Sequence, residues 1–195
     1  MQKPSELTKE QIEQMRKFAE LPAEKKVELL EKQCIFCQIA KGNVETVKVY
    51  EDPTLIAALD INPATTGHTL LFPKKHFQFF FQMPSEVRTN LFELAGRLSI
   101  YLVNLVSANG INLYAANGLA AGQRVPHFVL HLIPRFEDDG ISFDWEAKKA
   151  SKKELENLAA AIRKSFEKEK PARKPDQKKV DEELERELKK FRRRA

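Results

Sequence analysis

The segment from residue 127 to residue 133 constrains the fold more than any other part of the chain. In an extended strand, side chains two residues apart lie on the same face. The two faces of this segment therefore differ, with His127, Val129 and His131 on one and Phe128, Leu130 and Leu132 on the other. A single histidine is usually structural, but two on one strand face after a glycine-containing loop favour a functional site. One face is expected to be reactive and the other to belong to the core.

The central region predicts an α+β fold built on an antiparallel sheet. A long helix is expected to begin at Ser85 and to end at Asn109-Gly110, because apolar residues recur at helical spacing between them. This apolar stripe should pack on the sheet. Extended segments bounded by turn-forming residues are predicted at residues 47–50, 55–61, 68–72, 111–115 and 127–133.

Both ends of the chain are predicted to be helical extensions. Near the N-terminus, Thr8 and Gln11 have the spacing of a capping box, and Pro22 is suited to begin a second short helix. Near the C-terminus, Ser151 begins another capping box, and an apolar stripe at helical spacing follows it. The stripe over residues 176–194 is so thin that we expect this segment to be frayed or to depend on a partner. The predicted domains are an N-terminal extension at 1–32, a core domain at 33–146 and a C-terminal extension at 147–195.

The C-terminal extension is strongly basic. Residues 147–195 contain 18 Lys or Arg and 10 Asp or Glu, a net charge of +8, whereas the whole chain carries +5. Residues 1–146 therefore carry −3. A basic tail is attracted to polyanions such as RNA, but Lys/Glu-rich segments are more often solvated helix faces, and we weigh the second interpretation roughly two to one over the first.

The sequence contains no apolar run near the roughly 18 residues that a membrane span requires. Its polar N-terminus also lacks the apolar stretch of a signal peptide. We therefore predict a cytoplasmic protein with no membrane contact.

The two cysteines, Cys34 and Cys37, are too few for a disulfide scaffold and too close together to link distant segments. A Cys-x2-Cys pair is half of many tetrahedral zinc sites, and the same spacing occurs in redox pairs. A redox pair would favour a strand–helix context, which the surrounding sequence lacks. The cysteines therefore indicate local chemistry, with zinc as the leading interpretation.

The sequence from Gly122 to Arg135 resembles the signature of the histidine triad (HIT) nucleotide hydrolases and transferases, in which three histidines alternate with apolar residues. The resemblance covers roughly residues 33–140. It implies an antiparallel sheet with helices on one side, usually in a homodimer. Supporting matches lie at Cys34–Gly42, Val49–Asp52, Leu59–Pro63, Gly67–Thr69 and Pro73–His76.

The sequence departs from the family pattern at the position that carries the reaction. In the family, the middle histidine attacks the α-phosphorus, and here that position is Val129. An isopropyl group has no lone pair, and removal of a covalent nucleophile can cost on the order of 10⁶ in turnover, about 8 kcal/mol of barrier. Ala116 replaces the first of two asparagines, which predicts the loss of one phosphate contact. Arg124 replaces a small hydroxyl or acidic residue and could either reach a phosphate or fill its space.

Other nucleotide-binding positions are retained by the same resemblance. Asp60 matches the carboxylate that accepts hydrogen bonds from the ribose hydroxyls, a role that suits a group with several acceptor sites and no donor. The candidates for the phosphate side are Asn117, Gln123, Arg124 and His131. The candidates for the base-binding wall are Ile35, Phe36, Ile39, Leu59 and Ile61. Ordinary core packing explains each member of this apolar set about equally well.

The resemblance also implies a complete zinc site. Family members with the Cys pair, including the related galactose-1-phosphate uridylyltransferases, add the histidine of Pro-Lys-x-His and the first triad histidine. The implied ligands of a structural Zn²⁺ are thus Cys34, Cys37, His76 and His127. A closed site of this kind can stabilise a small domain by about 10 kcal/mol. As a zinc ligand, His127 would be unavailable as a base.

Three functions remain open from the sequence. The first is a zinc-containing, purine nucleotide-binding HIT protein that has lost most or all nucleotidyl hydrolase or transferase activity. The second is an active nucleotide phosphoramidase or hydrolase in which water attacks directly, with His131 or His68 as the catalytic residue. The third is an RNA- or ribosome-interacting module that acts through the basic tail.

Overall fold

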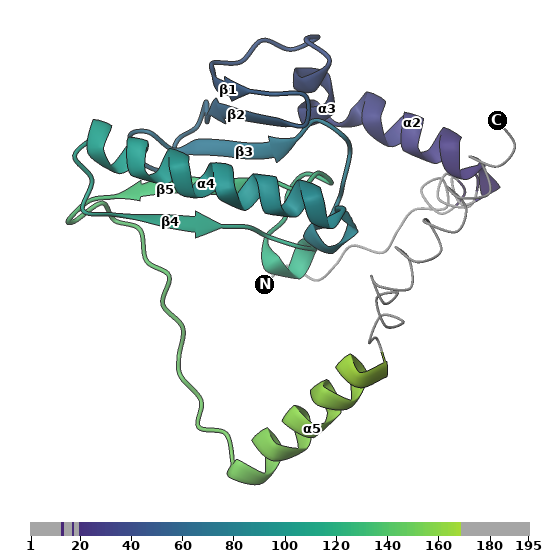
Figure 1. The fold of residues 1–195 in the computed structure, drawn as a ribbon, viewed down its shortest axis with the longest axis vertical. Coiled ribbons are helices and arrows are strands. Elements are labelled where there is room, and N and C mark those ends of the chain that lie inside the picture. The colour runs from purple at the N-terminus through teal and green to yellow at the C-terminus, as the bar shows by residue number, and fades with distance from the viewer. Residues whose placement is uncertain (1–12, 14–16, 18–19, 169–195) are drawn as a thin grey trace, which may run out of the picture. The chain divides into compact units, whose positions relative to one another are not determined.

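The computed structural model describes Glu13, Lys17 and residues 20–168 of the chain (Figure 1). The chain divides into two compact units between Ser142 and Phe143. The second unit contains α5 (Lys152–Lys168). The described elements of the first unit are α2 (Ala23–Gln33), α3 (Ile35–Ala40), β1 (Lys48–Glu51), β2 (Leu55–Leu59), β3 (Thr69–Pro73), α4 (Ser85–Leu105), β4 (Gly110–Tyr114), β5 (Leu130–Arg135) and short 3₁₀ helices at Phe80–Gln82 and Leu119–Ala121.

The strands of the first unit form one antiparallel sheet in the order β1-β2-β3-β5-β4. This arrangement confirms the predicted α+β class. Because β5 lies between β3 and β4, His131 has a cross-strand neighbour on each side, Leu70 on β3 and Tyr114 on β4. The sheet therefore places the second histidine of the 127–133 segment in a central strand.

Both faces of the sheet are covered. In β2, Leu55 and Ala57 belong to the core cluster that contains the apolar stripe of α4, whereas Ile56 and Ala58 pack in a second cluster with α3. Burial on two sides explains why β2 is almost continuously apolar rather than alternating. Figure 1 shows α4 lying across one face of the sheet. The expectation that the helices lie on one side of the sheet is therefore wrong for α3.

The long helix α4 begins at Ser85, with Pro84 rather than Ser85 at the N-cap, and ends at Leu105, before the predicted stop at Asn109-Gly110. The chain leaves the helix earlier because Ser107 has a φ of 53°, which a helix cannot contain. Most of the predicted apolar stripe packs as expected, with Leu91, Leu94, Ala95 and Leu102 buried, but Leu105 at its end is exposed.

The strand predicted over residues 127–133 starts three residues later than expected, at Leu130. Its ladder with β3 is confined to Leu130–Leu132. Before it, the backbone N–H of Phe128 donates to the carbonyl of Phe77, at 2.6 Å, beyond the end of β3. The predicted alternation nevertheless holds, since Phe128, Leu130 and Leu132 pack with the α4 cluster and Val129 packs with the α3 cluster.

The predicted helix starts are confirmed where the structure describes them. Pro22 directly precedes α2, and Ser151 forms a reciprocal capping box with Glu154 at the start of α5. The Thr8–Gln11 capping box and the helix expected over residues 176–194 lie outside the described residues. Within the described part of the chain, no helix combines the length and apolarity needed to cross a lipid bilayer.

Candidate functional site

Four side chains from three separate segments meet beside α3. Cys34 directly precedes α3 and Cys37 lies within it, whereas His76 follows β3 and His127 precedes β5. The Nδ1 atom of His127 lies 3.3 Å from the Sγ of Cys34 and 3.6 Å from the Sγ of Cys37, and the Nδ1 of His76 lies 3.2 Å from the Sγ of Cys37. In a tetrahedral zinc site, the metal–ligand bond lengths place nitrogen and sulfur ligands about 3.6 Å apart. The four side chains therefore have nearly the spacing that a zinc ion requires.

The protonation of His127 also suits a metal ligand. Its Nε2 lies 2.9 Å from the carbonyl oxygen of Pro73, which can only accept, so Nε2 carries the proton and Nδ1 presents a lone pair to the two sulfur atoms. Burial lowers the pKa of His127 to about 4, which keeps the imidazole neutral. The residues that would hold a metal ion here are therefore arranged as a donor set.

The other side chains of the cluster also have features that a bound cation would stabilise. Burial and the neighbouring Cys34 raise the pKa of the Cys37 thiol to about 12. The Nε2 atom of His76 is buried without a hydrogen-bond partner in the described structure. Thiols and imidazoles brought together in this way fit a divalent cation, because its charge reverses the cost of forming thiolates.

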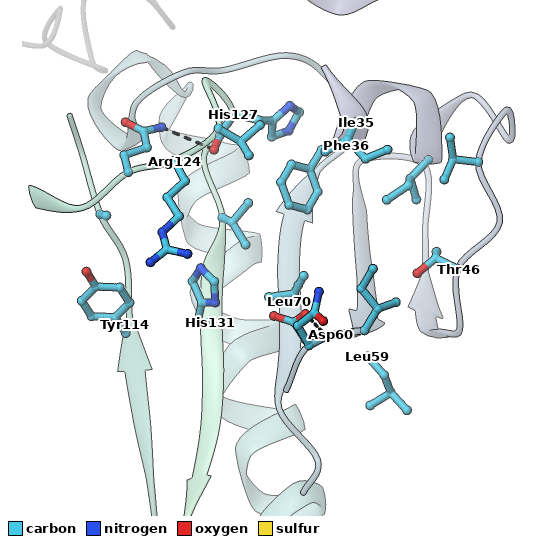
Figure 2. A pocket seen from close by; sticks show the side chains of 18 of the residues that line it. Ile35, Phe36, Thr46, Leu59, Asp60, Leu70, Tyr114, Arg124, His127 and His131 are labelled. Carbon is cyan, nitrogen blue, oxygen red and sulfur yellow. Dashed lines mark hydrogen bonds between the residues drawn. The ribbon is translucent and has the colours of Figure 1, made fainter. Parts of the chain in front are cut away.

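A cavity of about 750 Å³ adjoins this cluster, within the range of about 300–1,000 Å³ typical of small-molecule sites (Figure 2). His127 belongs to both the cluster and the cavity wall. The lining residues that the sequence predicted are Ile35, Phe36, Ile39, Leu59, Asp60, Ile61, Gln123, Arg124 and His131. Val129 also lines the cavity.

The cavity has an apolar side and a polar side. In Figure 2, Ile35, Phe36 and Leu59 lie on one side, whereas Arg124 and His131 lie on the other. The Asp60 carboxylate lies between the two sides, and one of its oxygens accepts a hydrogen bond from the backbone N–H of Asn62 at 2.9 Å. The order of apolar wall, carboxylate and cationic group matches the order of base, sugar and phosphate in a nucleotide.

A hydrogen-bond chain fixes the proton on His131. The backbone N–H of Ala64 donates to Nδ1 of His68 at 3.1 Å, so the neutral His68 carries its proton on Nε2. That Nε2 lies 3.0 Å from Nδ1 of His131, which must accept. The 3.6 Å separation between Asp60 and Nδ1 of His68 is too long to compete. Burial lowers the pKa of both histidines, so both stay neutral and His131 carries its remaining N–H on Nε2.

Three predicted site residues have other positions or partners. His68 does not line the cavity and contacts it through His131. Asn117 is also absent from the cavity wall, and its side-chain oxygen accepts the backbone N–H of Phe80 at 2.7 Å. Gln123 lines the cavity, but its amide accepts from Gly118 at 2.7 Å and donates to the carbonyl of Gln78 at 2.8 Å. These amides anchor the loop that precedes β5.

This loop depends on two glycines with positive φ. Gly118 and Gly122 have φ values of 95° and 88°, which other residues rarely adopt, and they bracket the short helix Leu119–Ala121. A Cβ atom at position 122 would also lie 3.3 Å from the Tyr114 hydroxyl. The loop therefore needs glycine at position 122 in order to bring Arg124 to the cavity.

The sequence did not identify several residues of the wall. Leu70 and Tyr114 line the cavity because each lies opposite His131 in the sheet register, a signal that appears only once the strand order is known. Another part of the wall comes from the irregular segment at residues 44–46, which has no periodicity to identify it. The remaining lining residues that were not predicted are Asn62, Ala116, Gly122 and Val125.

Residues 41–138 match the model of the HIT domain family. An uncharacterized HIT-like protein of Borreliella burgdorferi is 42% identical over 112 residues, which cover 56% of this chain and 81% of the relative. The crystal structure of a HIT family member from Bacillus subtilis is 33% identical, has a TM-score of 0.65, and covers 68% of this chain and 96% of its own. The chain belongs to the HIT domain family.

Two further matches have names that state an enzymatic activity or a bound metal ion. The adenosine 5′-monophosphoramidase HNT1 of Saccharomyces cerevisiae is 34% identical over 130 residues, covering 66% of this chain and 80% of the yeast protein. The crystal structure of a zinc-bound histidine triad family protein from Mycobacterium smegmatis is 31% identical, has a TM-score of 0.54, and covers 70% of this chain and 99% of that chain. Members of this family thus include a nucleotide hydrolase and a zinc-bound protein.

Proposed function

We propose that this chain is a zinc-containing HIT protein that binds a purine nucleotide and has lost most or all nucleotidyl transfer. The observation that carries the proposal is the position of Val129 in the wall of the cavity, between the neutral imidazoles of His127 and His131. An aliphatic side chain here leaves the nucleotide-shaped cavity without the group that attacks phosphorus in the family. The yeast monophosphoramidase supports an adenine nucleotide as the ligand class.

Binding follows from the layout of the cavity. The wall that includes Ile35 and Phe36 would take the base, and Asp60 would accept hydrogen bonds from the ribose hydroxyls. Phe36 is held from behind by Phe72, with ring centroids 4.8 Å apart. A wall whose aromatic ring is already fixed lowers the ordering cost of binding.

Direct water attack would need a general base, and the proton positions on the two cavity histidines do not favour this role for them. Nδ1 of His131 already accepts from His68, and its Nε2 carries a proton, so neither nitrogen offers a lone pair to a water in the cavity. Nδ1 of His127 faces the two cysteines, and its Nε2 donates to Pro73. General-base assistance, typically worth 10²–10⁴-fold, is therefore not available from these imidazoles in their neutral form.

The metal part of the proposal assigns a structural Zn²⁺ to Cys34, Cys37, His76 and His127. Their spacing and the zinc-bound relative from Mycobacterium smegmatis support it. When bound, the ion would tie α3 to the segment that follows β3 and to the segment that precedes β5, and so would hold Phe36 and Ile39 at the cavity.

We also propose the homodimer that the resemblance implies. β4 forms one edge of the sheet among the described strands, with Leu113 half exposed. The helix α4 leaves Ile100, Tyr101 and Leu105 exposed. An interface between two copies would cover these groups.

Calorimetric titration of the full chain with AMP and GMP tests the binding proposal. We expect one site per chain. Asp60→Asn should weaken binding by about tenfold, because hydrogen bonds to a charged acceptor are worth about 1.5–3 kcal/mol. Asp139→Asn is the matched control, since that carboxylate pairs with Arg135 and is absent from the cavity wall. Absence of heat with every purine nucleotide would remove the proposed function.

A further inference from the structure

On the polar side of the cavity, fewer side chains are available to bind a phosphate than the sequence predicted. Asn117 and Gln123, two of the predicted phosphate contacts, are bound to backbone groups of the protein. Both ends of the Gln123 amide therefore have partners before a ligand arrives, whereas Asn117 does not line the cavity. Of the four predicted phosphate contacts, Arg124 and His131 therefore remain available to a ligand.

The position of Arg124 suits a residue that binds an anion. It lines the cavity, is exposed, and has no ion pair or hydrogen bond with any residue in the described part of the chain. Figure 2 shows its side chain extending toward His131 and Tyr114. A guanidinium group is always charged, and its paired N–H groups match the oxygens of a phosphate.

His131 adds a neutral donor at the same place. The chain of hydrogen bonds from Ala64 through His68 leaves its proton on Nε2, as derived above from the 3.1 Å and 3.0 Å contacts. The Tyr114 ring lies beside the imidazole, with ring centroids 5.9 Å apart. A donor pair on Arg124 and one donor on His131 give three N–H groups on this side.

We infer that Arg124 and His131 make the cavity selective for a nucleotide whose phosphate is a free monoester dianion. This inference rests on the proposed nucleotide binding and names its ligand class. A terminal monoester has three non-bridging oxygens and two negative charges, which match three donors and a full positive charge. A diester or an amidate has one charge and fewer free oxygens, so it gains less from the guanidinium.

The positions of the acidic groups agree with this assignment. In Figure 2, Asp60 lies on the other side of His131 from Arg124, toward the apolar wall. The other carboxylate of the wall, Glu45, adjoins Thr46, which lies at the far side of the cavity from Arg124. The cationic group therefore acts on the phosphate without a competing carboxylate beside it. The site would hold the nucleoside monophosphate that hydrolysis releases more tightly than the ester or amide that hydrolysis consumes.

Calorimetry with adenosine, AMP and the methyl ester of AMP tests this selectivity on the full chain. We expect the unaltered protein to bind AMP at least about tenfold more tightly than the methyl ester. In Arg124→Ala, the preference should fall to about threefold or less, whereas adenosine affinity should change by less than about twofold. Arg124→Lys should recover part of the preference, because it restores the charge but not the paired N–H groups. Arg97→Ala, on the exposed side of α4, is the matched control and should leave all three affinities unchanged.

The outcomes separate this inference from the function on which it rests. Equal affinity of the unaltered protein for AMP and its methyl ester, or an undiminished preference in Arg124→Ala, overturns the role of Arg124 while nucleotide binding stands. Failure of all three ligands to bind overturns the nucleotide-binding proposal and the selectivity together. If Arg124→Ala loses its fold by circular dichroism, the same comparison is made with Arg124→Gln.

Discussion

Replacing Val129 by histidine is expected to raise the hydrolysis of adenosine 5′-phosphoramidate at least about 100-fold over the unaltered protein. An imidazole at this position supplies the lone pair that an isopropyl group lacks, and removal of such a nucleophile costs on the order of 10⁶ in turnover. We expect only part of this factor to return, because Arg124 and Ala116 remain at the phosphate side. Steady-state release of AMP, measured by chromatography, gives the rate.

Val129→Leu is the matched control, since it also enlarges the side chain but brings no nucleophile. Val129 is only 8% exposed and packs in the cluster that contains Phe36 and Phe72, so a larger group carries a packing cost. AMP binding and the melting temperature of both variants should therefore be measured beside the rate. The account is contradicted if Val129→His binds AMP normally but hydrolyses the phosphoramidate no faster than Val129→Leu.

Removal of the metal ion is expected to have the largest effect on stability. The purified chain should contain about one zinc per molecule, and Cys34→Ser should lose it. Loss of a metal site is among the few changes that cost more than about 4 kcal/mol, and for a chain of this size that corresponds to a melting temperature lower by about 10 °C. Elemental analysis and differential scanning calorimetry measure the two quantities.

His131→Gln serves as the control for the metal experiment, because His131 is a partly buried histidine outside the cluster. It should retain zinc.

The metal-free protein should also lose stability as the pH falls from about 6.5 toward 4. The sign follows from His127, whose pKa is lowered to about 4 in the folded chain and returns to about 6.5 on unfolding, so the unfolded state binds more protons in this range. A folded protein without metal, equally stable in Cys34→Ser, would refute the zinc assignment.

The two faces of the 127–133 segment could be predicted because strand side chains alternate with a period of exactly two residues wherever the backbone is extended. The start of the strand could not be predicted, because it depends on where β3 ends and on the backbone hydrogen bond between Phe128 and Phe77. The same limit applies to Leu70 and Tyr114, whose place in the cavity wall follows from the strand order rather than from their own neighbours in sequence.

The hydrogen-bond partners of two predicted polar site residues could not be inferred from the sequence. The amides of Asn117 and Gln123 were expected at a phosphate, but they bond to backbone groups near residues 78–80, about 40 positions away in the chain. An amide can satisfy a ligand or a buried backbone group equally well, and sequence spacing does not distinguish these. The convergence of the Cys and His residues at 34, 37, 76 and 127 was anticipated only through the family resemblance, because their separations carry no local signal.

The central claim is that the cavity holds a nucleotide without transferring it. A crystal of the full chain, soaked at saturating concentration with adenosine 5′-phosphoramidate, tests this most directly. We predict an intact phosphoramidate, with its base against Phe36, its ribose at Asp60 and its phosphorus next to Val129. An empty cavity, or density for a cleaved nucleotide or an adduct on His131, would contradict the account.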